Sequence, residues 1–391
     1  MKNFIYNTPT KIFFGKGYEN KLGEILSSYN TKKVLLHYGK SSVKKTGLYD
    51  LIINQLNASK IDFVELGGVS PNPKLSLVLE GVKMCKKENV DLILAVGGGS
   101  VIDSAKSISN GAMVDHSPWL FNIKEKESKN HIPVGVILTH SAAGSEMSNS
   151  CVITNDDTLE KRGFSSEENR CLFAIMNPEL TYTVNEYQTA CGIVDILMHT
   201  LERYLSLGDA TPITDNIALG LMKSVIEAGR IVMKNPKDYN ARATLMWASS
   251  LSHNGLTGTG REYVMSVHQI EHELSGMFDE ISHGAGLAAL WPSWAMISYN
   301  ACPERFLRLA YEVMDIPKTE DSNADIIACI NQIKLFFKSI GMPTCLRELN
   351  VPKEALNSLA MNSMFNGKRV LEDVVTVDYE KALEILNLAY L

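Results

Sequence analysis

The sequence predicts two domains of different class, an α/β domain over residues 1–184 and an all-α domain over residues 185–391. Two observations predict this division. Up to about residue 180, short apolar runs alternate with stretches of helical periodicity, which indicates a layered α/β fold. From about Asn185 onward, almost every segment carries apolar residues three and four positions apart, which is typical of packed helices.

The first half contains four apolar runs of strand length. The strands are expected at Lys33–His37, Phe63–Leu66, Asp91–Val96 and Ile132–Leu138. The last two are nearly continuous in apolar residues, as expected for strands buried on both faces of a parallel sheet. The helices between them are expected at Val43–Asn57, Lys74–Glu88 and Ser100–Asn110. The N-terminal segment Phe4–Phe14 is a further expected strand, able to pair with the sheet edge of a partner.

The second half is expected to consist of helices. Those with the clearest periodicity are Ile217–Asn235, Tyr239–Asn254, Tyr263–Met277, Pro303–Met314 and Ala324–Ile340. The longest uncharged apolar stretch, Gly284–Tyr299, is interrupted by Pro292. Because it is shorter than the roughly 20 residues needed to cross a bilayer, it predicts a buried helix and no membrane association.

Charge and cysteine usage narrow the class of protein. The formal net charge of −6, without a basic cluster, argues against nucleic acid as a partner. The seven cysteines are scattered and form no CxxC pair, which argues against disulfides and against a cysteine-rich zinc site. The N-terminus lacks the apolar core of a secretory signal. A cytoplasmic location is therefore expected.

A glycine-rich turn follows the expected strand Asp91–Val96. It comprises Gly97, Gly98, Gly99 and Ser100. Glycines allow the backbone to turn tightly and to approach a ligand closely, and a helix beginning near Ser100 directs N–H groups and its positive dipole end toward a phosphate. We expect this turn to bind a pyrophosphate. The alternative is a plain strand-to-helix turn with Ser100 as N-cap, since the usual GxGxxG pattern is absent.

The residues after the expected strand Lys33–His37 bear on the choice of cofactor. An acid near the adenosine ribose commonly selects NAD by bonding the 2′-hydroxyl. No acid stands here, whereas Gly39, Lys40 and Ser41 suit a 2′-phosphate. The pattern predicts NADP(H) in preference to NAD(H), although a solvated turn explains the same residues equally well.

The second half contains a carboxylate and four histidines at helical spacings. Asp195 and His199 lie four residues apart within an apolar run, where a carboxylate is costly unless it is paired or binds a metal. His268 and His272 share another helical face, and His283 follows. Such ligands suit Fe²⁺ or Zn²⁺. Hydrogen-bonded core histidines and a simple Asp–His pair are the alternatives, and the spacing leaves open which of the five residues are ligands.

A family resemblance extends over essentially the whole chain, from Tyr6–Lys11 and Phe14–Gly17 to the C-terminal helices, and five motifs carry it. They are GGGSVIDSAK at 97–106, THSAAGSEM at 139–147, NPELTYT at 177–183, NEYQTACGIVDILMHTLERY at 185–204 and HQIEHELSGMFDEISHGAGLA at 268–288. The chain resembles the iron-containing (group III) alcohol dehydrogenases, most closely their NADPH-dependent butanol dehydrogenase and aldehyde reductase branch. This resemblance implies a Rossmann-like N-terminal domain and an all-α C-terminal domain, the dehydroquinate synthase-like architecture. It also implies a homodimer.

The resemblance further implies roles for individual residues. The implied metal ligands are Asp195, His199, His268 and His283, and His272 is the implied catalytic residue beside the nicotinamide and substrate. The implied cofactor contacts are Gly39, Lys40, Ser41, Gly97, Gly98, Gly99, Ser100, Asp103, Thr139, Ser148 and Lys161. The chain departs from the family pattern in the connection from His272 to His283, which is longer by one residue, and in His140 and Ala143 of the second motif.

The implied activity is hydride transfer between a nicotinamide and a small primary alcohol or aldehyde of butanol or butanal type, with the metal acting as a Lewis acid toward the substrate oxygen. Within the superfamily, the alternatives are a polyol dehydrogenase of glycerol or propanediol type and a dehydroquinate-synthase-like lyase. The lyase would need a basic cluster, and only Arg261 stands near the metal motif. A metal-dependent hydrolase without a redox cofactor is an alternative of another class. A nucleotide-sensing module would leave the buried Asp/His set unexplained.

Overall fold

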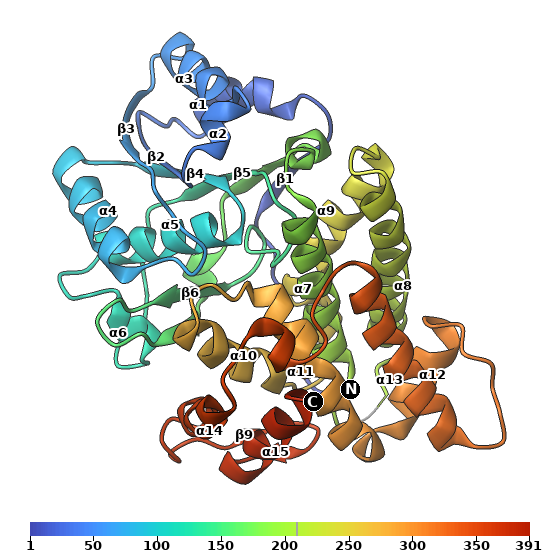
Figure 1. Ribbon diagram of the computed structural model, residues 1–391. Coiled ribbons are helices and arrows are strands. Elements are labelled where there is room, and N and C mark those ends of the chain that lie inside the picture. The colour runs from blue at the N-terminus through green and yellow to red at the C-terminus, as the bar shows by residue number, and fades with distance from the viewer. Residues whose placement is uncertain (209) are drawn as a thin grey trace. The chain divides into compact units, whose positions relative to one another are not determined.

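The structure is a computed structural model that describes residues 1–208 and 210–391. Its contacts divide the chain into two compact units, coloured blue to green and green to red in Figure 1. Residues 7–184 form the α/β unit, and residues 185–391 with residues 1–6 form the helical unit. The first six residues, assigned above to the first domain, belong instead with the helical unit, where the N–H of Lys2 donates to the carbonyl of Gly260 over 2.8 Å.

The α/β unit is built on a six-stranded parallel sheet. Its strands are β1 (Lys11–Phe14), β2 (Lys33–Tyr38), β3 (Asp62–Leu66), β4 (Leu92–Gly97), β5 (Val134–Leu138) and β8 (Phe173–Met176). Their order across the sheet is β1-β8-β5-β4-β2-β3, and every pair is parallel. All residues of β4 and β5 are buried, which confirms the expectation from their continuous apolar character.

Helices and one small strand pair complete this unit. The helices are α1 (Leu22–Ser28), α2 (Ser42–Lys45), α3 (Leu48–Ala58), α4 (Leu75–Glu88), α5 (Gly99–Ala112) and α6 (Trp119–Asn122). The antiparallel pair is β6 (Ser150–Thr154) with β7 (Lys161–Ser165).

Three local expectations are corrected in this unit. The single helix expected over Val43–Asn57 is broken at Gly47, whose φ of +78° cannot continue a right-handed helix. The strand expected over Phe4–Phe14 covers only Lys11–Phe14. Helix α5 begins at Gly99, one residue before the expected start at Ser100, and its N-cap is Gly98 rather than Ser100.

The strand order brings the predicted cofactor residues together at the carboxyl ends of the strands. From β2 the chain adds β3 on one side and then β4 and β5 on the other, so that its direction of growth reverses between β2 and β4. In the register, Tyr38 of β2 pairs with Val96 of β4, and Gly97 pairs with Leu138 of β5. Open α/β sheets bind ligands at such a reversal, outside the carboxyl ends of the strands.

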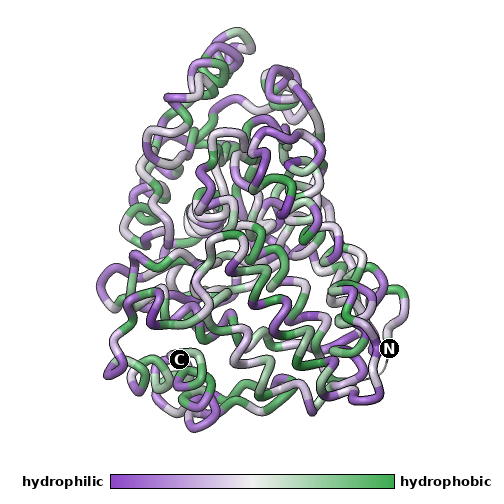
Figure 2. The backbone as a smooth tube through the Cα atoms, turned by 45° about the vertical axis from the view of Figure 1, so that its right-hand side comes forward, coloured by the Kyte–Doolittle hydropathy of each residue, from purple (hydrophilic) through white to green (hydrophobic). Residues whose placement is uncertain are grey.

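The helical unit contains nine α-helices over its described residues. They are α7 (Glu186–Tyr204), α8 (Pro212–Lys234), α9 (Tyr239–His253), α10 (Ser266–Met277), α11 (His283–Ser298), α12 (Pro303–Glu312), α13 (Ser322–Ser339), α14 (Leu356–Ser363) and α15 (Tyr379–Ala389). An antiparallel pair of two-residue strands, β9 (Leu371–Glu372) with β10 (Thr376–Val377), is the departure from an all-α domain. Figure 2 shows hydrophobic and hydrophilic positions alternating along these helices, as the periodicity predicts.

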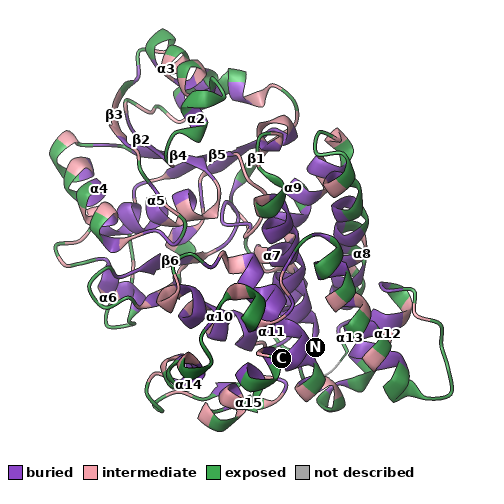
Figure 3. Cartoon of the chain, viewed as in Figure 1, coloured by how far each residue is buried: buried purple, intermediate pink, exposed green. Residues whose placement is uncertain are grey.

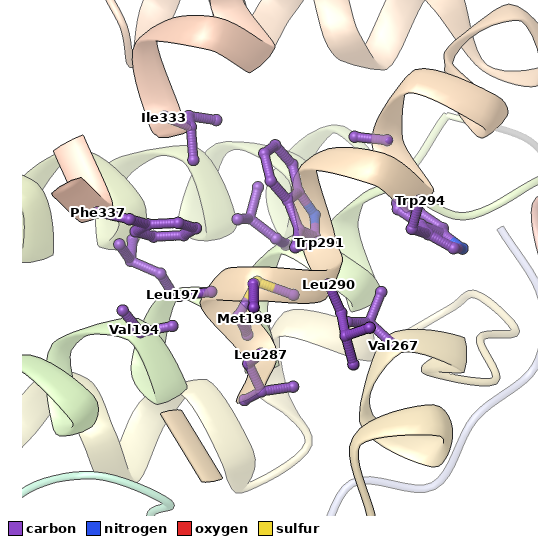
Figure 4. Packing of buried hydrophobic residues seen from close by; sticks show 14 of the residues in the cluster. Val194, Leu197, Met198, Val267, Leu287, Leu290, Trp291, Trp294, Ile333 and Phe337 are labelled. Carbon is purple, nitrogen blue, oxygen red and sulfur yellow. The ribbon is translucent and has the colours of Figure 1, made fainter. Parts of the chain in front are cut away.

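The core of this unit is formed around α7 and α11. The side chain of Asn185 caps α7 by accepting from the N–H of Gln188 over 2.8 Å, and every residue from Thr189 to Tyr204 is buried (Figure 3). Helix α11 is the buried helix expected near Gly284–Tyr299, and Trp291 packs edge-on against Phe337 with ring centroids 6.4 Å apart (Figure 4). Among the described residues, no helix has the length and apolar character to cross a membrane.

Candidate metal and cofactor sites

Helix α7 presents Asp195 and His199 on one face of the helical unit. Both side chains are buried, and the Nδ1 atom of His199 lies 3.1 Å from Oδ1 of Asp195. The four-residue spacing puts them on the same side of the helix, one turn apart. The sequence-based pairing of these two residues is thus realised in space.

Two further histidines reach the same carboxylate oxygen from other helices. His268 lies in the first turn of α10, and His283 is the first residue of α11. Their Nε2 atoms each lie 3.7 Å from Oδ1 of Asp195. His272 is near this group, with its ring centroid 5.5 Å from that of His283 and 6.5 Å from that of His268. The structure therefore brings together all five residues that the sequence analysis singled out.

The hydrogen bonds of the histidines distinguish their ring nitrogens. Nδ1 of His199 lies 3.0 Å from the backbone carbonyl of Asp195, that of His268 lies against the Glu202 carboxylate, and that of His283 against the Glu271 carboxylate. Carbonyl and ionised carboxylate oxygens only accept hydrogen bonds, so each Nδ1 carries a hydrogen. In the neutral imidazole, Nε2 then keeps its lone pair, which is the arrangement found in metal-ligating histidines.

A further histidine, His253 at the end of α9, was not singled out from the sequence. Its ring centroid lies 4.0 Å from that of His199, and its Nδ1 accepts a hydrogen bond from the Arg203 guanidinium over 2.7 Å. A guanidinium only donates, so the hydrogen of the neutral His253 ring must be on Nε2. Burial holds the pKa of His253 well below its ordinary value. This tautomer argues against His253 as a ligand, despite its position.

The local electrostatics favour an ionised carboxylate among imidazoles. Burial opposes ionisation of Asp195, but His199, His268 and His283 outweigh it and hold the pKa of Asp195 well below its ordinary value. Burial lowers the pKa of His199 to about 4. Burial acts in the same direction on His268, but the Glu202 carboxylate raises the pKa of His268 to about 9.

The cluster has the donors and the unmet polar atoms that a divalent cation requires. In the described part of the chain, buried Oδ1 of Asp195 and Nε2 of His268 have no hydrogen-bond partner, a costly state for polar atoms away from water. One carboxylate oxygen with three imidazole nitrogens suits Fe²⁺ or Zn²⁺. The residues that would hold the ion are Asp195, His199, His268 and His283.

Two glycines explain how His283 reaches this group. A Cβ atom on Gly284 would lie 2.2 Å from the backbone oxygen of Cys191, so α11 approaches α7 directly at the turn before Asp195. A Cβ atom on Gly286 would lie 2.8 Å from Cγ of Glu271, the residue that bonds His283. The HGAG segment thus provides His283, a close backbone approach and room for the Glu271 carboxylate beside His283.

The glycine-rich turn of the α/β unit lies where the topology predicts a phosphate site. It connects β4 to α5, and the Thr139 N–H that follows β5 donates to the carbonyl of Gly97 over 3.0 Å. The first N–H groups of α5 have no partners within the helix and are thus suited to bind an anion. The carboxyl ends of β4 and β5 therefore bring together five of the predicted cofactor residues, Gly97, Gly98, Gly99, Ser100 and Thr139.

The THSAAGSEM segment lies against this turn. A Cβ atom on Gly98 would lie 3.0 Å from Cβ of His140, and one on Gly99 would lie 3.3 Å from Oγ of Ser145 and 3.4 Å from Cβ of Ala143. His140 and Ala143 are thus neighbours of the glycine-rich turn. The glycines make room for these side chains.

Three of the expected cofactor contacts are buried or tied within the protein. The Ser148 hydroxyl lies 3.2 Å from the ammonium group of Lys106. One carboxylate oxygen of Asp103 accepts the N–H of Val152 over 3.0 Å, and burial raises the pKa of Asp103. Lys161 is a buried residue of β7. In this structure Asp103 and Ser148 hold α5 against the segment leading into β6.

The loop after β2 lies beside the start of α5. A Cβ atom on Gly39 would lie 4.0 Å from the Val101 side chain and 3.7 Å from the carbonyl of Val69. Lys40 and Ser41 are exposed. The neighbouring acid on β3, Glu65, accepts hydrogen bonds from the hydroxyls of Tyr38 and Tyr49 over 2.9 and 2.7 Å.

Comparison with known proteins gives this arrangement a family. Residues 9–178 match the profile described as iron-containing alcohol dehydrogenase, and residues 189–390 match its C-terminal counterpart. The chain is 38% identical to the NADH-dependent butanol dehydrogenase A of Clostridium acetobutylicum, over the full length of both chains. It is 35% identical to the NADPH-dependent aldehyde reductase YqhD of Escherichia coli, covering 92% of each.

A solved structure agrees with these matches. The crystal structure of the NADH-dependent butanol dehydrogenase A of Thermotoga maritima superposes with a TM-score of 0.96 at 36% identity, covering 100% of this chain and 99% of the other. The full-length sequence matches and the shared fold lead to one conclusion. The chain belongs to the iron-containing alcohol dehydrogenases, a family of oxidoreductases that use NAD(P) and a divalent metal.

Proposed function

We propose that this chain reduces small aldehydes and oxidises small primary alcohols, by hydride transfer to or from a nicotinamide. The observation that carries the proposal is the convergence of His199, His268 and His283 on a single oxygen of Asp195. A divalent cation held by these four residues supplies a Lewis acid that stabilises negative charge on the substrate oxygen. The names of the two sequence relatives, a butanol dehydrogenase and an aldehyde reductase, support substrates of this size.

His272 is proposed as the residue that relays the alcohol proton. It lies next to the ligand set, with its ring centroid 5.5 Å from that of His283, and it is half-buried rather than fully enclosed. An imidazole near the reacting oxygen with access to water can accept and release a proton near neutral pH.

NADP(H) is proposed as the preferred cofactor, on the chemistry of the loop after β2. Gly39 offers no carboxylate to the ribose, and exposed Lys40 and Ser41 offer donors to a 2′-phosphate. The nearby acid Glu65 is bonded by two tyrosine hydroxyls, Tyr38 and Tyr49. The relatives named above are divided between NADH and NADPH, so the loop itself carries this part of the proposal.

A steady-state screen tests the activity and the cofactor together. After loading with Fe²⁺ or Zn²⁺, aldehydes of two to six carbons are reduced with NADPH and with NADH, and kcat/KM is compared. We expect turnover that depends on the metal and a higher kcat/KM with NADPH. Turnover with a higher kcat/KM for NADH would refute the cofactor preference alone. Absence of any change in protein fluorescence on titration with either nucleotide would favour a hydrolase instead.

A homodimer is proposed from the edge of the sheet. Strand β1 is an outer strand, paired with β8 on one side, and the preceding residues Phe4, Ile5 and Tyr6 are exposed although apolar. Unpaired strand edges and exposed apolar side chains are typical of surfaces that pair with another chain. Light scattering should give twice the chain mass of 43.2 kDa. A mass of one chain at micromolar concentration would contradict this.

A further inference from the structure

Two carboxylates lie against histidines of the cluster, and both are almost inaccessible to solvent. Glu202 on α7 is 1% exposed and Glu271 on α10 is 0% exposed. An isolated buried carboxylate is expensive, so each must have partners that compensate for lost hydration. Each bonds Nδ1 of one histidine, His268 for Glu202 and His283 for Glu271.

We propose that Glu202 and Glu271 are positioning residues that aim the Nε2 atoms of His268 and His283 at one cation beside Asp195. This inference rests on the metal site of the proposed function and extends it to residues that touch neither the cation nor the substrate. Because each carboxylate accepts the Nδ1 hydrogen, it selects the tautomer and fixes the rotation of the ring. The outcome is symmetrical, since both Nε2 atoms lie 3.7 Å from the same oxygen of Asp195.

Glu202 bonds the N-terminal end of the helix that carries His268 as well as the His268 ring itself. Helix α10 begins after Met265, which has a φ of +62° and provides no side-chain cap. The second oxygen of Glu202 accepts the N–H of Val267 over 2.7 Å and lies 3.4 Å from the backbone nitrogen of His268. A carboxylate at this end of a helix satisfies free N–H groups and favours the dipole. Glu202 thus bonds both the backbone at the start of the helix and the ring of His268, while Asp373 accepts the N–H of Ser266 over 3.1 Å beside it.

Glu271 sets His283 across the connection between two helices. It follows His268 by three residues on α10, yet its carboxylate bonds the first residue of α11. Gly286 leaves the space that its side chain occupies. The longer connection between His272 and His283 is therefore compatible with the site, because the ring angle of His283 is set by Glu271 and not by the loop.

Ion pairing that merely stabilised the fold would leave a different pattern. Such pairing would not require the Nε2 atoms of His268 and His283 to face the same oxygen of Asp195. It would also not leave Nε2 of His268 and Oδ1 of Asp195 buried without hydrogen bonds in the described part of the chain. Structural ion pairs are satisfied on their own, whereas these two carboxylates bond histidines whose other ring nitrogens face Oδ1 of Asp195.

The test measures metal affinity and ligand geometry rather than turnover. The full-length protein is stripped of metal and titrated with Co²⁺ against a chromogenic chelator, and the d–d absorption of the Co²⁺ form is recorded. Glu202→Met and Glu271→Met remove the acceptor, and we expect each to weaken Co²⁺ binding by about a hundredfold and to alter the d–d bands. Glu202→Gln and Glu271→Gln keep an acceptor oxygen, and we expect a loss of about tenfold.

A matched control is Asp325→Asn. Asp325 is a buried carboxylate of the same unit, 2% exposed, that bonds Tyr311 and Thr319. It should change the free energy of unfolding without changing Co²⁺ affinity or the spectrum. NADPH binding should be unchanged in all folded variants.

A double-variant cycle keeps the proposal falsifiable if a Met variant fails to fold. Glu271→Gln should weaken Co²⁺ binding in the unmodified protein but have no further effect in a His283→Ala background, since Glu271 acts through that ring. An equal effect in both backgrounds, or unchanged affinity and d–d bands in folded Met variants, would overturn the inference. If the unmodified protein bound no stoichiometric Co²⁺, the metal site of the proposed function would fail instead.

Discussion

The glycine-rich turn, which is the proposed phosphate turn, and the histidine cluster are built in opposite ways. The turn is made from consecutive residues, Gly97 to Ser100, and would bind a phosphate through backbone N–H groups at the start of α5. The cluster is made from side chains of α7, α10 and α11, and the chain returns to it after about seventy residues. A backbone site is specified locally, whereas a side-chain site depends on how distant helices pack.

The two sites also differ in what surrounds their glycines. At Gly97 an added Cβ would meet the Val101 side chain, and at Gly98 that of His140. At Gly284 it would meet the backbone of Cys191 at 2.2 Å. Side chains can rotate away and backbone in a buried helix cannot, so the metal site should respond more severely to a small change in volume.

The largest expected effect separates His268 from His272. His268→Ala removes a proposed ligand, and the purified protein should contain almost no metal. Activity should fall by at least about a hundredfold, which corresponds to roughly 2.7 kcal/mol of transition-state stabilisation. His272→Ala should retain near-stoichiometric metal, while kcat falls or its pH profile shifts. Elemental analysis of both proteins measures the difference.

Equal metal loss in the two variants would mean that the ligand set is misassigned. The comparison of sites would then change, because the longer connection before His283 would have moved a different imidazole onto the cation. The NADPH affinity of both variants is the control, since the phosphate turn lies in the other unit.

The sequence predicted the glycine-rich turn and the helical positions of Asp195 and His199 because both depend on short-range spacing. Asp195 and His199 are one helical turn apart, and three glycines after an apolar strand are contiguous. The fold class followed from periodicity in the same way. The broken helix at Gly47 was missed because a left-handed glycine leaves the apolar pattern on either side intact.

The residues around the cluster could not be predicted in the same way. Glu202 lies three residues after His199, but its bond is to His268, 66 positions later. His253 comes from α9 and reaches the group only through the packing of α9 on α7. Spacing within one helix carries no information on such partners. The hydrogen bonds at Nδ1 support the proposed distinction between ligands and neighbours, which the spacing leaves open.

A titration should expose an acid sensitivity of the α/β unit that arises from a buried histidine outside the histidine cluster. His37 at the end of β2 is fully buried, with ring nitrogens 2.7 Å from the carbonyl of Leu66 and 2.8 Å from the hydroxyl of Ser104 on α5. Burial lowers the pKa of His37 to about 4 from 6.5. Between these values the unfolded chain binds a proton that the folded one does not, so stability falls as the pH is lowered through this window.

The expected loss from His37 is about 3 kcal/mol between pH 6.5 and pH 4. His37→Asn keeps a donor for Leu66 but does not titrate. The unfolding free energy of this variant, from denaturant melts, should depend less on pH by that amount. Parallel curves for the two proteins would show that His37 does not contribute to the acid sensitivity.

Gly284→Ala tests the close approach of α11 to α7. Since the clash is with backbone, we expect a loss of about 1–3 kcal/mol in unfolding free energy together with weaker metal binding, because His283 must shift. Gly220→Ala is the matched control, as it lies in α8 with nothing within 4 Å of the added Cβ. That change should stabilise the protein by about 0.5–1 kcal/mol. Full metal occupancy in Gly284→Ala would show that the helices can separate without disturbing the ligands.

The smallest effect concerns the backbone site and its choice of nucleotide. Gly39→Asp adds a carboxylate where the ribose of the cofactor is proposed to lie, and the added Cβ meets its nearest neighbours at 3.7 and 4.0 Å, which is ordinary contact. The fold should therefore be unaffected. Repulsion of the 2′-phosphate and a new acceptor for the 2′-hydroxyl should shift the ratio of kcat/KM for NADPH over NADH by about tenfold toward NADH, or about 1.4 kcal/mol.

Gly68→Asp is an unsuitable control because Gly68 has a φ of +99°. The comparison is therefore made with Ser41→Ala, which removes a donor without adding charge. A loss of activity with both nucleotides at an unchanged ratio would show that the loop after β2 does not contact the ribose, and that cofactor choice lies elsewhere in the α/β unit.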